Sequence, residues 1–510
     1  MTDTFSSMYS WWEFAPAIGL AALAILLLMA DTFLPKFPKR AYAAVGAIGS
    51  FCAAYACWSQ YASCATGWLG AFACFACVAT GVCLLLNIDY HAITCESVNG
   101  GQSEEGSGEF SALPLIAAAG ICALSHARDL IMLFVGLETV TLSSYVLVGY
   151  YRRNQGSIEA GIKYLILGAL STGLLVFGAA WYYGMTGELA LNANVVAGAL
   201  CGGPTNAAII HSGFVMALCF LIAAGLFKIG AAPMHTWIPD VYQGAPTPVS
   251  AFLAVASKVA GFIFLIILLT PVYIAPTLDV PAPQGLQIGM AVIAAATLLI
   301  GNLGAIPQRN AKRLLGYSSI GQAGFILAFF QGGACRSSEV TLFYLIAYGL
   351  ATLPAFCAIA LVRAQRGSEE ISAFRGLART NPRLAFLITV CFASLAGVPL
   401  TWGFLAKLFS FVSLLASPFC CGVWMAWTLL GIMVVCAAAG FYYYFKIIRA
   451  MYWEKPLPGD KPLRLPLITG CIITVCVIAL LVVGTLPIFS GCDFFDVSAS
   501  AYTRIPTAFP

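Results

Sequence analysis

Five ionisable residues stand inside long apolar stretches of the sequence. They are Glu138, Lys163, Lys228, Lys258 and Lys407. A charge at the centre of a bilayer costs about 2.5–3.5 kcal/mol on insertion scales, so a spanning segment that keeps one usually needs it. Lysine loses its proton readily when buried, whereas arginine stays charged. We therefore expect these five residues to transfer protons.

Glu138 and Lys228 are expected to interact as acid and base. A nearby carboxylate offsets the cost of burying an ammonium group. If the pair opened, Lys228 would be left alone in the apolar interior and would hand its proton on, with Lys258 and Lys407 as receivers. The alternative is that each lysine reaches the membrane surface or forms a static ion pair. His235, in PMHTWIPD, is either a further relay or a hydrogen-bonded loop histidine.

The composition excludes a soluble fold. Of the 510 residues, 61% are hydrophobic and 9% are charged, whereas soluble domains carry about 25% charged residues. The net charge of +4 is small, and the sequence has no basic stripe with interleaved aromatics, so no nucleic-acid partner is expected. No basic segment precedes the first apolar run, so we expect no cleaved signal peptide.

Most of the 19 cysteines lie in apolar stretches. One C-x-x-C motif, Cys74 to Cys77, falls within a predicted helix, where a metal site would need two more ligands close by. Cysteine also behaves as a small apolar residue. We therefore expect no metal site, no disulfide framework and no iron–sulfur cluster in this chain.

The apolar runs predict an all-α membrane protein with about fourteen transmembrane helices. Two runs are interrupted by glycine and proline. One ends at Lys228 and is followed by IGAAPMHTWIPD, and the other spans 383–417 and contains AGVPLTWGF. Such breaks are tolerated where protein or water satisfies the freed backbone groups, and they mark ion sites in many transporters. Two discontinuous helices are therefore expected.

A weak internal repeat predicts four units. Residues 1–111 form an N-terminal three-helix unit with a polar linker at 91–111, and residues 112–271 form a five-helix repeat. Residues 285–447 form a second repeat, inverted because five is odd, and 448–510 form a last helix and tail. Fourteen crossings put five basic loops on one side, which the positive-inside rule assigns to the cytoplasm, so both termini are expected outside. The basic loops lie at 35–40, 150–154, 307–313, 363–383 and 446–464.

The segment FKIGAAPMHTWIPDVYQGAPTPVSAFLAVASKVAGF, at 227–262, resembles the core motif of the antiporter-like subunits of proton-pumping NADH:quinone oxidoreductase, respiratory complex I. Its DVYQGAPTPV is most like the N-type subunits. The segments 133–178, 301–327 and 376–411 resemble the same family, so the resemblance covers about 110–450.

The resemblance implies a role for each candidate residue. Glu138 corresponds to the fifth-helix glutamate and Lys228 to its seventh-helix partner, with Lys163 as the sixth-helix lysine that modulates the pair. Lys258 corresponds to the central eighth-helix lysine and Lys407 to the twelfth-helix lysine near the exit.

Two comparisons within the family bear on the assignment. M-type subunits usually have glutamate at the position of Lys407, and the sequence ends too soon after its last span for the lateral helix of L-type subunits. Family members often have histidine at the position of Gln322, which cannot titrate. A proton path through that point would have to run on water.

The resemblance therefore implies a proton-translocating membrane-arm subunit of complex I. Flavin, iron–sulfur clusters and quinone are expected in partner subunits and no cofactor in this chain, which lacks a Walker loop and a dinucleotide-binding glycine motif. The expected partners are other membrane-arm subunits and the lipid bilayer, in the inner membrane of a bacterial-type cell. The alternative is a subunit of a multi-subunit cation/proton antiporter without redox activity. A solute carrier would need a polar substrate cavity, and a structural anchor would not need Glu138 and Lys228.

Overall fold

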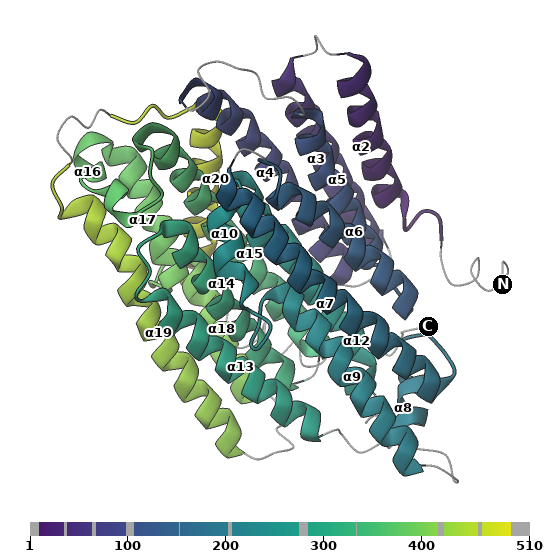
Figure 1. Ribbon diagram of the computed structural model, residues 1–510. Helices are drawn as coiled ribbons and strands as arrows, with labels where there is room; N and C mark the ends of the chain where they lie inside the picture. Colours follow the sequence, from purple (N-terminus) through teal and green to yellow (C-terminus); the bar gives the residue numbers. More distant parts are fainter. Residues whose placement is uncertain are drawn as a thin grey trace.

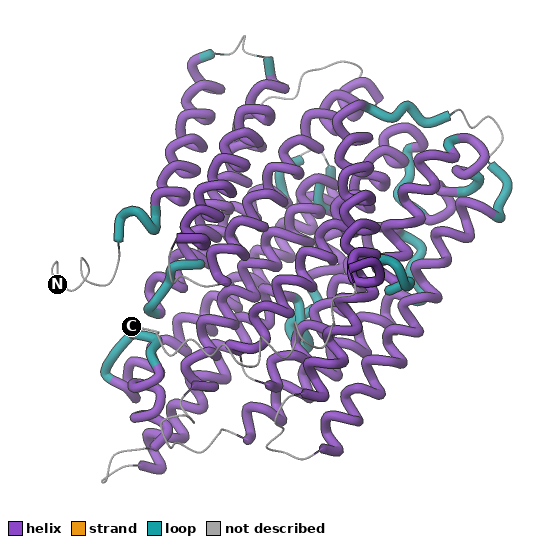
Figure 2. The backbone as a smooth tube through the Cα atoms, turned by 180° about the vertical axis from the view of Figure 1, so that it is seen from behind, coloured by secondary structure: helices purple, strands orange, loops and turns teal. Residues whose placement is uncertain are grey.

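The computed structural model describes residues 10–34, 38–63, 68–97, 107–151, 154–201, 207–274, 284–332, 334–416, 423–456 and 462–490. Within these ranges the chain is helical, with loops and two isolated β-bridges but no strand (Figures 1 and 2). The predicted all-α fold is confirmed. α2 and α19 lie at opposite edges of the bundle in Figure 1, and the broken helices that carry the candidate lysines lie between them.

The helices have the following bounds: α2 (Ala15–Phe33), α3 (Lys39–Ser63), α4 (Trp68–Ser97), α5 (Ser107–Leu124), α6 (Leu130–Val148), α7 (Gln155–Thr186), α8 (Ala193–Cys201), α9 (Ala207–Ile229), α10 (Trp237–Gly244), α11 (Thr247–Phe252), η1 (Leu253–Ser257), α12 (Lys258–Ile274), α13 (Gln284–Ala305), α14 (Ala311–Leu327), η3 (Ala328–Gly332), α15 (Ala334–Arg366), η4 (Ile371–Phe374), α16 (Leu377–Thr380), α17 (Pro382–Ala396), α18 (Trp402–Ala416), α19 (Val423–Tyr452) and α20 (Leu467–Ser490).

Eleven helical segments of the described ranges are long and apolar enough to cross a membrane. Together with α5, α14 and the α17–α18 pair, they give the fourteen predicted crossings. The predicted polar linker at 91–111 is shorter than expected, because α4 continues to Ser97 and α5 begins at Ser107. Residues 98–106 lie outside the described ranges.

The first helix break lies between α9 and α10. Gly230 adopts a positive φ of 69°, and the Ala231 amide donates to the Leu226 carbonyl at 2.8 Å, which closes the end of α9. The Trp237 indole N–H donates to the Phe227 carbonyl at 2.9 Å. Protein groups thus satisfy carbonyls that the break would otherwise leave unpaired in the membrane interior.

The second break lies between α17 and α18, and Lys407 closes it. Gly397 ends α17 with a φ of 89°. The Lys407 ammonium donates to the Leu395 carbonyl at 3.0 Å and to the Ala396 carbonyl at 2.8 Å. A cation at a helix C-terminus also complements the helix dipole. A β-carbon at Gly397 would lie 3.0 Å from the Lys407 side chain, so glycine leaves room for this cap.

A third irregularity, which the sequence did not predict, lies directly before Lys258. Residues Leu253–Ser257 form a π-helical turn, η1, inside the helix that runs from α11 to α12. π-turns occur mostly as single bulges in α-helices, often at functional sites. No glycine or proline marks this turn, which is why the sequence shows a continuous apolar run here.

The basic segment 307–313 is not entirely a loop. Asn310 caps α14 by accepting a hydrogen bond from the Arg313 amide at 3.1 Å. Lys312 therefore belongs to the first turn of α14, and its side chain is fully buried. The charge pattern placed this lysine on the membrane surface, whereas the packing of α14 turns it inward.

Candidate functional site

Three of the predicted residues are buried lysines beside helix irregularities. Lys228 lies in the last turn of α9, Lys258 begins α12 after the π-turn, and Lys407 lies in the second turn of α18. Each is 6% exposed or less. Because each side chain ends in the apolar interior and donates only to uncharged oxygens, none of them reaches the membrane surface.

Glu138 and Lys228 form no ion pair, and Lys228 instead contacts Thr141, which lies one helical turn from Glu138 on α6. The Lys228 ammonium donates to the hydroxyl of Thr141, and the Thr172 hydroxyl donates to the Glu138 carboxylate at 2.9 Å. Glu138 and Thr141 are three residues apart on α6, so they share one face of the helix. No ion pair joins Glu138 to Lys228 among the described residues, and the predicted pair is open in this structure.

The helix that Lys258 begins packs against Lys228, and Lys258 itself bonds to α14. A β-carbon at Gly261 would come within 3.1 Å of the Lys228 β-carbon, so α12 meets α9 at this lysine. The Lys258 ammonium lies 2.5 Å from both the carbonyl and the hydroxyl of Ser319, and 5.4 Å from the ring centroid of Tyr348. Oxygen atoms and an aromatic face thus hold this cation without an acidic partner.

A line of polar contacts runs on from Lys258 to Lys407. Ser318, beside Ser319, hydrogen-bonds the hydroxyl of Tyr444 on α19. The Gln322 amide nitrogen donates to the same hydroxyl at 3.2 Å and to the Leu395 carbonyl at 3.3 Å. Leu395 is also the carbonyl that Lys407 caps. α14 therefore places a buried polar link between the two lysines.

Gln322 occupies the centre of this link. It accepts a hydrogen bond from the Tyr344 hydroxyl on α15, so four helices meet at its side chain. The sequence singled out Gln322 for its inability to titrate but did not predict the serine and tyrosine hydroxyls around it. Hydroxyls in apolar helices are common, and only the helix packing shows which of them converge.

Lys163 lies apart from the buried lysines. Its side chain is 43% exposed and forms ion pairs with Glu159 at 2.7 Å and Asp240 at 3.0 Å. Arg313 binds the other oxygen of Asp240 at 2.7 Å. Lys163 therefore ties α7 to α10, and its ion-pair partners are Glu159 and Asp240 rather than Glu138, although the resemblance assigns it influence over the Glu138–Lys228 pair. Asp240 on α10 thus bridges Lys163 on α7 and Arg313 on α14.

Lys312 is a buried cation that the sequence analysis missed. Its ammonium lies 2.8 Å from the Glu369 carboxylate and donates to the Ala245 carbonyl at the end of α10, also at 2.8 Å. Arg363 forms a second ion pair with Glu369 at 2.5 Å. The side chain thus fixes the first broken helix against α14. The signal that could have found it is its position two residues after an N-cap asparagine, Asn310, which places it in the first helical turn.

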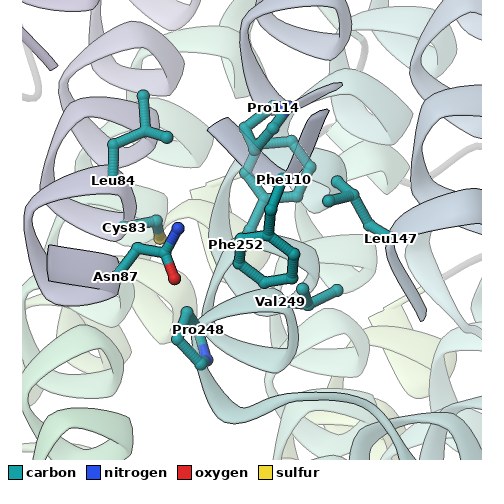
Figure 3. Close-up of a pocket in the computed structure, with 9 residues that line it drawn as sticks. All are labelled: Cys83, Leu84, Asn87, Phe110, Pro114, Leu147, Pro248, Val249 and Phe252. Atoms are coloured by element: carbon teal, nitrogen blue, oxygen red, sulfur yellow. The ribbon is translucent and has the colours of Figure 1, made fainter. Parts of the chain in front are cut away.

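His235 lies half-buried in the first break, where its carbonyl accepts the Ile238 amide at 3.1 Å. Among the described residues, no hydrogen bond joins its ring to Lys228, Lys258 or Lys407, so its role as a relay stays a prediction. A small pocket elsewhere, between α4, α5, α6 and α11, contains no ionisable lysine or carboxylate (Figure 3). Its polar group is the Asn87 amide, whose oxygen has no hydrogen-bond partner among the described residues.

Fourteen membrane-crossing segments, two broken helices and buried lysines at the breaks define an antiporter-like membrane protein. Residues 127–439 match the family described as NADH:quinone oxidoreductase/Mrp antiporter, transmembrane. The NADH-quinone oxidoreductase subunit N of Acidithiobacillus ferrooxidans is 38% identical over 391 residues, which cover 74% of this chain and 75% of that protein. The chain belongs to this family, as an N-type subunit.

Two solved structures share the fold. A chain of respiratory complex I from Thermus thermophilus superposes with a TM-score of 0.72 and 28% identity, covering 93% of this chain and 98% of that one. A chain of the Mrp complex from Dietzia sp. has a TM-score of 0.75 but 19% identity, over 96% of this chain and 97% of that one. The Mrp likeness shows the fold alone. The predicted relationship to complex I is confirmed.

Proposed function

We propose that the chain is the proton-translocating, non-redox membrane subunit of a bacterial-type NADH-quinone oxidoreductase. The observation that carries the proposal is the line of buried polar groups from Lys258 to Lys407. A buried polar network is costly to maintain in an apolar core unless its members are satisfied. Intramembrane ionisable residues commonly mark proton relays. The N-type relatives give the assignment to the oxidoreductase.

Glu138 and Lys228 form the switch of the proposed mechanism. With Lys228 on Thr141, the ammonium is held by a neutral hydroxyl, one turn from the carboxylate. Movement of the Lys228 side chain along the face of α6 would bring it to Glu138, which stabilises the charged amine. Return to Thr141 withdraws that support and favours proton release toward α12.

Lys258 and Lys407 complete the path. Lys258 receives the proton and passes it toward the hydroxyls of Ser319, Ser318 and Tyr444. Gln322 does not titrate, but its amide donates to the Tyr444 hydroxyl and orients it toward the second break. There Lys407 takes up the proton. Between Ser319 and Ser318 no hydrogen bond joins the two hydroxyls in the described chain, and there water carries the proton.

The energy for the cycle would come from partner subunits. We propose that flavin, iron–sulfur clusters and quinone lie in those partners, and that other membrane-arm subunits contact this chain within the lipid bilayer. The proposed location is the inner membrane, with both termini on the outer side. In this proposal the repeats 112–271 and 285–447 each supply one broken helix, between the unit 1–111 and the tail 448–510.

Purification of the native assembly in mild detergent tests the oxidoreductase assignment. We expect this chain to copurify with flavin and iron–sulfur subunits, identified by mass, and the preparation to reduce quinone with NADH. Addition of an inhibitor of flavin reduction should remove that activity and leave the subunit composition unchanged.

A colourless assembly of membrane subunits that exchanges sodium for protons would contradict the assignment. It would favour the antiporter alternative, with which this chain shares the fold.

A further inference from the structure

Three cysteine thiols meet inside the N-terminal part of the bundle, outside the proton path. Cys57 on α3, Cys77 on α4 and Cys122 on α5 are buried, at 1%, 0% and 1% exposure. Their sulfur atoms all lie within 4.8 Å of one another. Cys77 belongs to the C-x-x-C motif, for which the sequence showed no further ligands. The structure places two more thiols beside it, Cys57 from α3 and Cys122 from α5. The sequence could not show this, because the three residues are 20 and 45 positions apart.

The sulfur separations suit a shared metal ion. The Cys77 and Cys122 sulfurs are 3.4 Å apart, and those of Cys57 and Cys122 are 3.7 Å apart. Tetrahedral zinc with bonds of about 2.3 Å places its sulfur ligands about 3.8 Å apart. A disulfide bond would bring two sulfurs to about 2.05 Å and leave the third thiol over. Three sulfurs within 4.8 Å of one another, with two of the separations near the zinc value, are therefore better matched to a metal than to a disulfide.

His126 follows Cys122 by one helical turn but does not belong to the thiol cluster. Its Nδ1 lies 3.0 Å from the Cys122 carbonyl and 3.1 Å from the Ser125 hydroxyl. Its ring nitrogens do not lie within 4.8 Å of all three sulfurs. Among the described residues, the three thiols are therefore the protein ligands that surround the candidate site.

We propose that the thiolates of Cys57, Cys77 and Cys122 bind one thiophilic cation of closed d-shell. Thiolates select zinc and Cu(I) among the biological metals. Binding would release the thiol protons to solvent. Three thiolates leave a net charge of −1 on zinc and −2 on Cu(I), so the apolar surroundings favour zinc. The ion would fasten α3 and α4 to α5.

Metal analysis of the purified full-length chain tests the proposal. The reduced chain is loaded anaerobically with Zn²⁺ or with Cu(I), passed over a desalting column and analysed by mass spectrometry of the elements. We expect one equivalent of zinc per chain and less retention of copper. The triple variant Cys57→Ala, Cys77→Ala and Cys122→Ala should retain less than about a tenth of that zinc. The matched control replaces three buried thiols elsewhere, Cys83→Ala, Cys357→Ala and Cys391→Ala, and should retain the full equivalent.

X-ray absorption of the loaded wild-type chain keeps the test independent of how the variants fold. Three sulfur ligands on zinc, at about 2.3 Å, are expected. Retention of copper in preference to zinc, with sulfur ligands, would keep the site and reverse the choice of ion. A coordination shell of oxygen and nitrogen alone, no retained metal, or a Cys77–Cys122 disulfide in the native chain would overturn the proposal.

Discussion

Replacement of Lys228 by alanine is expected to stop most proton translocation while the complex still assembles. Lys228 lies at the first helix break and donates to the Thr141 hydroxyl. A positioned proton-transfer group contributes about 10²–10⁴-fold to the step that it serves. We expect pumping per quinone reduced to fall more than about tenfold, measured by dye quenching in membrane vesicles that contain the assembled complex.

Two variants separate loss of proton transfer from loss of structure. Lys228→Arg keeps the positive charge but does not release a proton, so it should pump as poorly as Lys228→Ala. Lys446 on α19 donates to the Gln308 carbonyl, just after α13, and is not part of the proposed path. Lys446→Ala should therefore pump like the wild type. Normal pumping by an assembled Lys228→Ala complex would contradict the proposed switch at Glu138 and Lys228.

Glu369→Gln is expected to lower the free energy of unfolding by about 3 kcal/mol, because it leaves Lys312 buried without an anion. The Lys312 side chain is fully buried, and Glu369 is its acidic partner at 2.8 Å. Uncompensated burial of a charge is among the most destabilising effects of a single substitution. Titration with sodium dodecyl sulfate in mixed micelles measures the difference.

An exposed ion pair of this chain provides the control. Arg375 and Glu454 pair with side chains that are 46% and 35% exposed, so Glu454→Gln should change stability by less than about 1 kcal/mol. The double variant Lys312→Met, Glu369→Gln removes both buried charges and should be more stable than Glu369→Gln alone. Equal losses for Glu369→Gln and Glu454→Gln would show that Lys312 is not held by this ion pair.

The sequence predicted the parts of the site that carry an uncommon signal. Lys228 and Lys407 stood out because each is a charge in an apolar run with glycine and proline nearby, and the structure places both at helix breaks. Lys312 was missed because a lysine in a basic segment resembles an ordinary loop cation. Its burial depends on where α14 begins, which the asparagine cap fixes.

The side-chain contacts of the candidate residues were harder to predict than their positions in the helices. Ser319, Tyr444 and Gln322 meet because α14 packs between α12 and the second break, and nothing local in the sequence records that packing. The three thiols at Cys57, Cys77 and Cys122 come together for the same reason, from separate helices. The π-turn before Lys258 has no sequence marker at all. Long-range packing decides these features, whereas local composition decides where a charge or a break occurs.

The most direct test of the central claim measures protons moved per NADH oxidised by the complex carrying Lys258→Met. Methionine keeps much of the volume of the side chain but removes the proton carrier between Lys228 and Ser319. We expect the assembled variant to move fewer protons per NADH than the wild type, because the segment of the path from Lys258 to Lys407 loses its first proton carrier. An unchanged ratio in an assembled, NADH-oxidising complex would contradict proton transfer through these buried lysines.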